Sequence, residues 1–528
     1  MNASVAAAWA LLPGYLSQHV LVSASALALG LALSLPLAVA ASRSAAVRWP
    51  SLLLASLVQT IPSLALLALF YPLLLALSGI SRAAFGHGFA ALGFLPALLA
   101  LTLYSMLPIL RNAVAGLAGV DPAIVEAARG VGMTDRQRLF SIEAPLAAPV
   151  IMAGVRTAAV WTIGAATLAT TVGQTSLGNY IFSGLQTENW VFVLFGCAAS
   201  AVLALAADQL LGLIESGLAA RRRWRVWTGA AGLALGTAAA LSPLVSFGAA
   251  PVRFVVGAKN FTEQYILADL IGERLKRAGA AVAMKEDLGS SIAFDALKAG
   301  EIDTYVDYSG TLWANVLKRT DNPGRAAVLA DLTTELKRRD GVVVLGSLGF
   351  ENAYVLAMRR SEAQALHIAT LADLAAHAGD LAMGADLEFL SRPEWAAVRD
   401  AYGLRFKRLV QYQPTFMYHA IASGQVDVIS AFSSDGRIAA DDLVVLADPR
   451  HALPPYDAVV LVSPRRAGDA RLIGALRPLI GRIPVTAMRA ASLMVDRDKA
   501  TPAQAARALA RRIGLAPAGA SAPPPMLR

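Results

Sequence analysis

Four aromatic residues in the second half of the chain lie at or beside the ends of apolar runs that predict β-strands. They are Tyr308, Tyr354, Phe432 and Tyr456. Taken singly, each is more typical of a core or turn aromatic. Together they predict an aromatic box, because ligands in folds of alternating strands and helices bind at the carboxyl ends of strands. A quaternary ammonium ion suits such a box: it donates no hydrogen bonds, and a ring face stabilises it by about 0.5–2 kcal/mol once desolvated.

A carboxylate on the same ligand would need a basic partner. Arg392, in the sequence Glu388-Phe-Leu-Ser-Arg-Pro393, is the candidate, because a guanidinium group can bind a carboxylate through two parallel N–H groups. The alternative is a surface arginine near the start of a helix. The residue types therefore predict a cleft for a cation that carries trimethylammonium, with or without a carboxylate.

The elements that would position these residues form an α/β pattern from Val252 onward. Strands are predicted over 253–257, 281–285, 302–306, 342–345, 354–358, 426–430, 443–446 and 458–462. Thr262 and Ser290 can cap the helices that follow the first two strands. Strands that alternate with helices predict parallel sheets covered by helices.

The composition of the chain changes near residue 250. The first 250 residues contain no lysine and only seven of the 37 acidic residues, the first being Asp121. Six apolar stretches there are long enough to cross about 30 Å of hydrocarbon: 20–41, 51–78, 89–110, 147–170, 191–215 and 228–248. We predict an all-α membrane domain over 1–250 with about six transmembrane helices, a soluble domain over 251–515, and a disordered tail over 516–528.

Arginine placement predicts the orientation of the membrane domain. The loops after the first, third and fifth spans hold ten arginines, whereas the alternate loops hold only Arg82. The ten are Arg43, Arg48, Arg111, Arg129, Arg136, Arg138, Arg221, Arg222, Arg223 and Arg225. Because basic loops stay in the cytoplasm, we expect a multi-pass protein of the bacterial inner membrane whose soluble half is extracytoplasmic (periplasmic).

The cytoplasmic loop between spans three and four predicts a docking element. Asp121 is a good N-cap for a short helix over 123–129, which would turn at the glycines that follow. A second helix from Asp135 would end before Pro145. Two short helices, rigidly turned, would suit a partner subunit.

This loop, over 121–145, resembles the EAA loop of ABC importer permeases. The matching positions are Glu126, Ala127, Ala128, Gly132, Ile142 and Pro145, while Ala144 replaces the usual leucine before the proline. In that family the loop sits in a cleft of the ATP-hydrolysing subunit. The resemblance implies a separate cytoplasmic ATPase, and the chain has no GxxxxGK[ST] motif of its own. Permeases of this family work in pairs, which implies a homodimer.

The second half resembles the substrate-binding proteins of osmoprotectant (glycine betaine, carnitine, choline) ABC importers over nearly all of 252–512. The motifs are Gly257-Ala-Lys-Asn-Phe-Thr-Glu-Gln264, Asp307-Tyr-Ser-Gly-Thr311, Phe432-Ser-Ser-Asp-Gly436 and Pro454-Pro-Tyr456. The family cages trimethylammonium with four aromatics, usually tyrosines, which match Tyr308, Tyr354, Phe432 and Tyr456. Its carboxylate-binding arginine matches Arg392. Thr311 and Asn352 line the same cleft, and Gln264 is a further candidate.

This resemblance implies two α/β lobes around a hinge, with the second lobe, about 357–450, inserted into the first. Phe432 keeps the ring of the usual tyrosine but lacks its hydroxyl, so the exact ligand stays open. Ergothioneine is the alternative ligand, since it is a trimethylammonium carboxylate that also carries a thioimidazole ring.

Other classes of protein fit less well. A net charge of +9 suggests nucleic acid, but the basic excess of the first half lies in short loops between spans. One cysteine, Cys197, and six scattered histidines predict no disulfide within the chain, no metal site and no cofactor. A membrane sensor would need a large cytoplasmic output domain, and an enzyme would need a catalytic constellation. The sequence thus predicts a transport subunit without catalytic residues.

Overall fold

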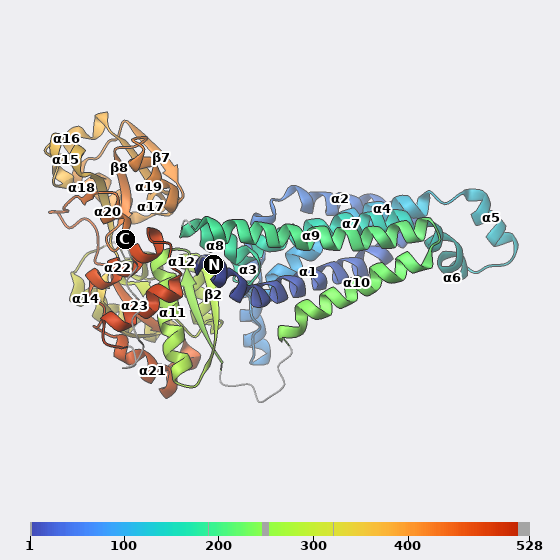
Figure 1. Cartoon of the computed structure of the whole chain (residues 1–528), viewed down its shortest axis with the longest axis horizontal. Helices are drawn as coiled ribbons and strands as arrows, with labels where there is room; N and C mark the ends of the chain where they lie inside the picture. Colours follow the sequence, from blue (N-terminus) through green and yellow to red (C-terminus); the bar gives the residue numbers. More distant parts are fainter. Residues whose placement is uncertain (1–2, 188, 245–252, 320, 516–528) are drawn as a thin grey trace. The chain divides into compact units, whose positions relative to one another are not determined.

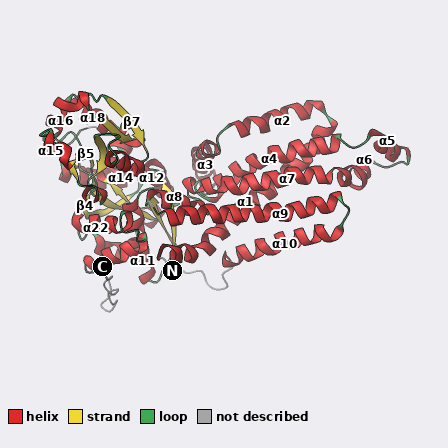
Figure 2. Cartoon of the chain, turned by 45° about the horizontal axis from the view of Figure 1, so that its top comes forward, coloured by secondary structure: helices red, strands yellow, loops and turns green. Residues whose placement is uncertain are grey.

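The computed structural model describes residues 3–187, 189–244, 253–319 and 321–515. The chain forms two compact units. One, here the membrane unit, comprises Val5–Ile181 and Val191–Ala249, and the other, the binding unit, consists chiefly of Ala250–Arg528. The membrane unit is helical, whereas the binding unit combines strands and helices (Figure 2). The predicted tail over 516–528 lies outside the described residues.

The membrane unit is built from long helices with short helices between them (Figure 1). They are α1 (Ala3–Arg43), α2 (Ala45–Thr60), α3 (Ser63–Phe85), α4 (Phe94–Ala118), α5 (Pro122–Gly130), α6 (Asp135–Arg138), α7 (Ala144–Ala166), α8 (Gly178–Gln186), α9 (Trp190–Ala219) and α10 (Arg223–Leu241). Five described helical stretches are long and apolar enough to cross a membrane: Ser4–Arg43, Ser63–Phe85, Phe94–Ala118, Asp135–Val172 and Trp190–Ala219.

Two of the predicted spans differ from these five. The stretch 51–78 is divided between α2 and α3, because Pro62 cannot continue a helix and holds Ile61 in an extended conformation. The stretch 228–248 overlaps α10, which is rich in alanine and glycine and carries Arg223 and Arg225 in its first turn. Residues 245–248 lie outside the described part of the chain.

Consecutive long helices run back and forth, so the arginine-bearing turns gather at one end of the membrane unit. The turn after α1, the segment between α4 and α7, and the turn between α9 and α10 all lie at that end (Figure 1). Helices α4 and α7 pack closely in the middle of the unit: a Cβ on Gly154 would lie 2.6 Å from the carbonyl oxygen of Pro108. This arrangement accords with the arginine asymmetry of the sequence.

The binding unit contains two five-stranded sheets, with strand orders β2-β1-β3-β10-β4 and β7-β6-β8-β5-β9. The first sheet comprises β1 (Arg253–Lys259), β2 (Ala281–Leu288), β3 (Thr304–Tyr308), β4 (Val343–Glu351) and β10 (Asp457–Val462). The second comprises β5 (Tyr354–Arg359), β6 (Ala382–Asp386), β7 (Arg408–Tyr412), β8 (Val428–Phe432) and β9 (Leu443–Val445). Each sheet combines parallel and antiparallel pairs.

Helices cover both sheets and are joined to the strands by short loops. They are α11 (Thr262–Arg277), α12 (Ser290–Ala299), α13 (Ser309–Thr311), α14 (Arg325–Asp340), α15 (Arg360–Ala365), α16 (Leu371–His377), α17 (Leu387–Ser391), α18 (Pro393–Tyr402), α19 (Pro414–Ala422), α20 (Arg437–Ala440), α21 (Ala470–Leu476), α22 (Val485–Asp496) and α23 (Pro502–Arg512). We call the part around the first sheet lobe one and the part around the second sheet lobe two.

The chain crosses between the lobes after β4 and again after β9. The crossings are tied together: the Asn352 N–H donates to the carbonyl of Tyr456 at 2.9 Å. Next to it, the Ala353 N–H donates to the Ser433 hydroxyl at 2.9 Å. The Ser433 N–H returns a bond to the Ala353 carbonyl, also at 2.9 Å. This bonded strip is where a hinge between the lobes would lie.

Candidate ligand-binding site

A cleft of about 410 Å³ lies between the lobes and is lined from both sheets. The four predicted aromatic residues line it, and so does Phe261, which the sequence analysis did not single out. The rings form a connected series. Tyr308 to Phe261 is 6.1 Å between centroids, Phe261 to Phe432 is 5.9 Å, Phe432 to Tyr354 is 4.8 Å, and Tyr354 to Tyr456 is 5.8 Å.

Strand ends position these rings. Tyr308 is the last residue of β3 and Phe432 is the last residue of β8. Tyr354 begins β5 and is the register partner of Phe432. Tyr456 precedes β10 and packs over Gly310, where a Cβ would lie 2.6 Å from the ring. A glycine is therefore required in the Asp307–Thr311 motif for the ring to approach the backbone.

Phe261 could have been found by the criterion that identified the other four. It lies two residues after the end of β1 and directly precedes α11, so it also lies at the carboxyl end of a strand. Its ring is nearly parallel to that of Phe432, with 4° between the planes. Thr262 was expected to cap α11, but its hydroxyl instead donates to Asp496 at 2.6 Å.

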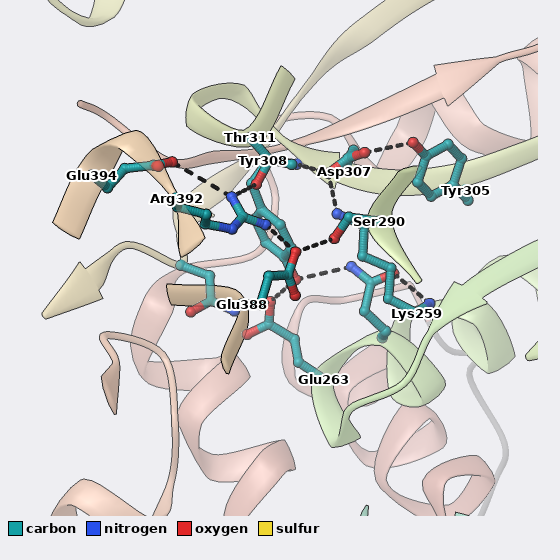
Figure 3. A network of polar contacts seen from close by, with 12 residues as sticks. Lys259, Glu263, Ser290, Tyr305, Asp307, Tyr308, Thr311, Glu388, Arg392 and Glu394 are labelled. Atoms are coloured by element: carbon teal, nitrogen blue, oxygen red, sulfur yellow. Dashed lines mark hydrogen bonds and ion pairs between the residues drawn. The ribbon is translucent and has the colours of Figure 1, made fainter. Parts of the chain in front are cut away.

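Behind the box, a buried polar network fixes Tyr308 (Figure 3). Its hydroxyl donates to Glu263 at 2.6 Å and accepts from the Gln264 side-chain amide at 2.9 Å. The Asn352 side-chain amide also donates to Glu263, at 3.2 Å. Thr311 and Asn352 line the cleft as expected, whereas Gln264 is not among the described residues that line it. Gln264 supports the box from behind Tyr308.

Burial controls ionisation in this network. It raises the pKa of Glu263 from its ordinary value of 4.5 to about 7, although three side-chain hydrogen bonds act in the opposite direction. Burial also raises the pKa values of Tyr308, Tyr354 and Tyr456 well above the usual range. These tyrosines therefore present neutral rings to the cleft at any physiological pH.

Arg392 lies in the cleft, between α17 and α18, beside the box. Its guanidinium group is 5.3 Å from the Tyr354 ring centroid and forms an ion pair with Glu388. A second carboxylate, Glu394, lies at 3.5 Å. The buried Nε of Arg392 has no hydrogen-bond partner among the described residues.

Side-chain hydrogen bonds join the lobes across the cleft (Figure 3), among them one from the Tyr456 hydroxyl of lobe one to Glu394 of lobe two. Arg392 of lobe two donates to the Thr311 hydroxyl of lobe one at 3.3 Å. The Ser290 hydroxyl donates to Glu388 at 3.0 Å. Ser290 was expected to cap its helix, but it makes no such bond and faces the other lobe instead. Burial acts to raise the pKa of Glu388, but the charge and hydrogen bond of Arg392, the charge of Lys259 and the Ser290 hydrogen bond together outweigh burial and hold the pKa below its usual value.

Lys259 is a second buried cation in the cleft, and sequence reasoning missed it. Its ammonium group forms an ion pair with Asp307 and lies 5.3 Å from the Tyr308 ring centroid. Asp307 also accepts from the Tyr305 hydroxyl at 2.5 Å. A buried ion pair between a strand end and its neighbour cannot be read from sequence spacing, because β1 and β3 meet only in the folded sheet.

The loop 121–145 forms the expected pair of short helices, with one correction. Asp121 caps α5 by accepting the Ala123 N–H at 2.8 Å, and Gly132 makes the left-handed turn with φ of 85°. The second helix does not end before Pro145. It continues through residues 139–143 into α7, where Pro145 occupies the first turn and needs no N–H partner.

Most of the predicted docking positions are accessible. Glu126, Ala127, Gly132 and Pro145 are exposed, Ile142 is half-buried, and Ala128 is buried. Large apolar side chains stand out beside them, among them Val131 and Phe140. An exposed apolar surface on two rigidly joined helices is typical of a protein-docking element.

Two family models match the chain. The substrate binding domain of the ABC-type glycine betaine transport system matches residues 252–511, and the binding-protein-dependent transport system inner membrane component matches residues 30–220. The chain is also 30% identical over 480 residues to the ergothioneine transport permease/ergothioneine binding protein EgtU of Helicobacter pylori (strain G27), covering 87% of this chain and 82% of that protein.

The chain belongs to the ABC importers that fuse a permease to a glycine betaine-type binding domain. As a member of this family, it is a transport subunit of the inner membrane that works with an ATPase.

Other relatives of this importer family match one half of the chain. It is 41% identical over 165 residues to the choline transport system permease protein OpuBB of Bacillus subtilis (strain 168), which covers 31% of this chain and 69% of that protein. A solved glycine betaine/carnitine/choline ABC transporter structure is 25% identical with a TM-score of 0.45, and covers 50% of this chain and 99% of that chain.

Proposed function

We propose that this chain is the permease and binding subunit of an ATP-driven importer for quaternary ammonium osmoprotectants of the glycine betaine, choline and carnitine class. One observation carries the proposal: a single cleft combines a series of aromatic rings with a buried arginine. The rings suit a trimethylammonium group, and the arginine suits a carboxylate.

The residues proposed to bind the ligand are Tyr308, Tyr354, Phe432, Tyr456, Phe261, Thr311, Asn352 and Arg392, with Gln264 as support. The ring faces would replace the weak hydration of a cation that cannot donate hydrogen bonds. Neutral tyrosines keep the box free of competing negative charge. Glu388 lies against Arg392, so a ligand carboxylate would compete with it for the guanidinium group.

For the membrane unit, we propose a homodimer in which each copy docks a separate ATPase at Glu126, Ala127, Ala128, Gly132, Ile142 and Pro145. The binding unit would then face the extracytoplasmic side. The arginines at one end of the helices support this orientation, because the same end carries the loop 121–145 (Figure 1).

Calorimetry on the full chain in detergent micelles tests the ligand class. The panel is glycine betaine, carnitine, choline, ergothioneine and proline, which lacks the three N-methyl groups. We expect at least one trimethylammonium compound to bind at least ten times more tightly than proline. Binding of none of the four, or proline as the best ligand, would refute the proposal.

Ergothioneine is the second candidate ligand, and a specific observation favours it. The relative named for ergothioneine covers 87% of this chain, whereas the relative named for choline covers 31% of it. The cleft also has polar lining beyond the box, including Asp386, Tyr412 and Gln413, which could contact a second ring. The same calorimetric panel separates the two candidates by rank order of affinity.

A further inference from the structure

A charged cluster lies among the helices of the membrane unit. The Arg156 guanidinium group of α7 donates two hydrogen bonds to Asp208 of α9, at 2.5 Å and 2.8 Å. A third goes to Glu215 of α9 at 3.4 Å. Arg156 was passed over in the sequence analysis, because the arginine count there covered only loops.

Arg156 and Asp208 lie deep within helices that are apolar enough to cross a membrane, whereas Glu215 lies four residues before the end of α9. Arg156 follows the start of α7 by 12 residues, and Asp208 precedes the end of α9 by 11. At 1.5 Å per residue each lies about 17 Å from its helix end, near the middle of about 30 Å of hydrocarbon. Charged side chains at that depth face a protein interior or water.

The backbone of α9 is arranged to accommodate the charged cluster. Asp208, Gly212 and Glu215 lie on one face of α9, at spacings of four and three residues. A Cβ on Gly212 would lie 3.4 Å from the guanidinium group, so the glycine leaves room for Arg156 between its two acids. Even so, the side chains remain open: Arg156 is 37% exposed, Asp208 20% and Glu215 29%.

An aromatic ring, that of Trp161, lies in the same hollow as the three charged residues. This hollow of about 370 Å³ is lined by the three charged residues together with Thr157, Val160 and Trp161. Trp161 is 51% exposed. The hollow therefore holds a cation-binding ring face, one guanidinium group and two carboxylates, which leaves one negative charge in excess.

We propose that this membrane cluster (Arg156, Trp161, Asp208 and Glu215) is a second, transient site for the quaternary ammonium ligand on its way through the membrane. The inference rests on the proposed function. Trp161 and the weakly held Glu215 would receive the trimethylammonium group, and Arg156 would receive a carboxylate. In the proposed homodimer, two such clusters would line one water-filled route.

Uptake by the full chain with its ATPase in proteoliposomes tests the site, with calorimetry on the same preparations. The probes are glycine betaine and choline, which lacks a carboxylate. Trp161→Ala should raise the KM for uptake of both probes about 3- to 30-fold, while the Kd measured by calorimetry stays within twofold. Trp161→Phe is the matched control and should restore most of the uptake.

Substrate discrimination separates a ligand site from a structural clamp. The double variant Arg156→Gln/Asp208→Asn keeps a neutral hydrogen-bonded pair between α7 and α9. It should slow glycine betaine uptake at least fivefold more than choline uptake. A clamp would instead lower the thermal midpoint and slow both probes equally, and that result overturns the inference. So does an unchanged uptake KM in Trp161→Ala. If the parent chain binds neither probe nor any other compound of the panel, the proposed function itself fails.

Discussion

Two arginines, one in each unit, lie between two carboxylates and close to an aromatic ring. Arg392 has Glu388, Glu394 and Tyr354, while Arg156 has Asp208, Glu215 and, in the same hollow, Trp161. Their environments differ: the Arg392 side chain is 5% exposed, against 37% for Arg156. Electrostatic and cation–π contacts are stronger where water is excluded. The same side-chain chemistry can therefore hold a ligand at one place and pass it on at another.

The first test asks whether the cleft is as water-free as this comparison requires. With a folded-state pKa of about 7 against an ordinary 4.5, Glu263 keeps its proton in the folded chain while the unfolded chain loses it. The resulting stability is fully present below pH 4.5 and is lost as the pH rises through 7. Glu263→Gln cannot ionise, so it should stabilise the protein by about 3 kcal/mol at pH 8 and little at pH 5.

Thermal unfolding of the full chain at the two pH values measures this difference. We expect a shift of about 5 °C or more at pH 8. An equal shift at pH 5 and pH 8 would show that Glu263 is solvated and that the contrast between the two arginines is overstated.

Removing the central ring tests the box directly. Tyr354 contacts the rings of Phe432 and Tyr456 and lies under Arg392. Tyr354→Ala should therefore weaken glycine betaine binding about 100-fold, since it deletes one ring face and loosens its neighbours. Tyr354→Phe, which keeps the ring, should stay within about threefold. Comparable losses in both variants would indicate that the hydroxyl, not the ring, binds the ligand.

Arg392→Lys sharpens the comparison at the arginine itself. Lysine keeps the charge but loses the planar pair of donors. Calorimetry should show glycine betaine binding about 10- to 30-fold more weakly and choline binding little changed, because choline has no carboxylate. A parallel loss for both ligands would assign Arg392 to the fold rather than to the carboxylate.

The smallest expected effect is an increase in affinity for glycine betaine. Glu388 shields Arg392 and is half exposed, so Glu388→Gln should free the guanidinium group and tighten glycine betaine binding about threefold. Choline should be unaffected. Weaker binding of both ligands would mean that the Ser290–Glu388 bond matters more for lobe closure than Glu388 does for competition.

The sequence predicts the strands that are apolar and the site residues that lie at strand ends. It does not predict β6, in which Met383 is the one large apolar residue, or β7, an exposed edge strand without an apolar run. For the same reason, the last residues of these two strands, Asp386 and Tyr412, were missed as parts of the cleft. Ion pairs such as Lys259–Asp307 and Arg156–Asp208 join distant segments. A single sequence does not show which distant residues will form such ion pairs.

The division of the rings between the lobes has a mechanical consequence. Tyr354 and Phe432 are paired in the second sheet, whereas Phe261, Tyr308 and Tyr456 belong to lobe one. The stack of Phe261 on Phe432 therefore spans the cleft. Opening the hinge would separate the rings of lobe one from those of lobe two, while each ring keeps its position within its own lobe. Release of the ligand would then depend on the hydrogen-bonded strip between β4 and β5, at Asn352 and Ala353. A substitution at Ala353 would slow ligand release without removing any contact to the ligand.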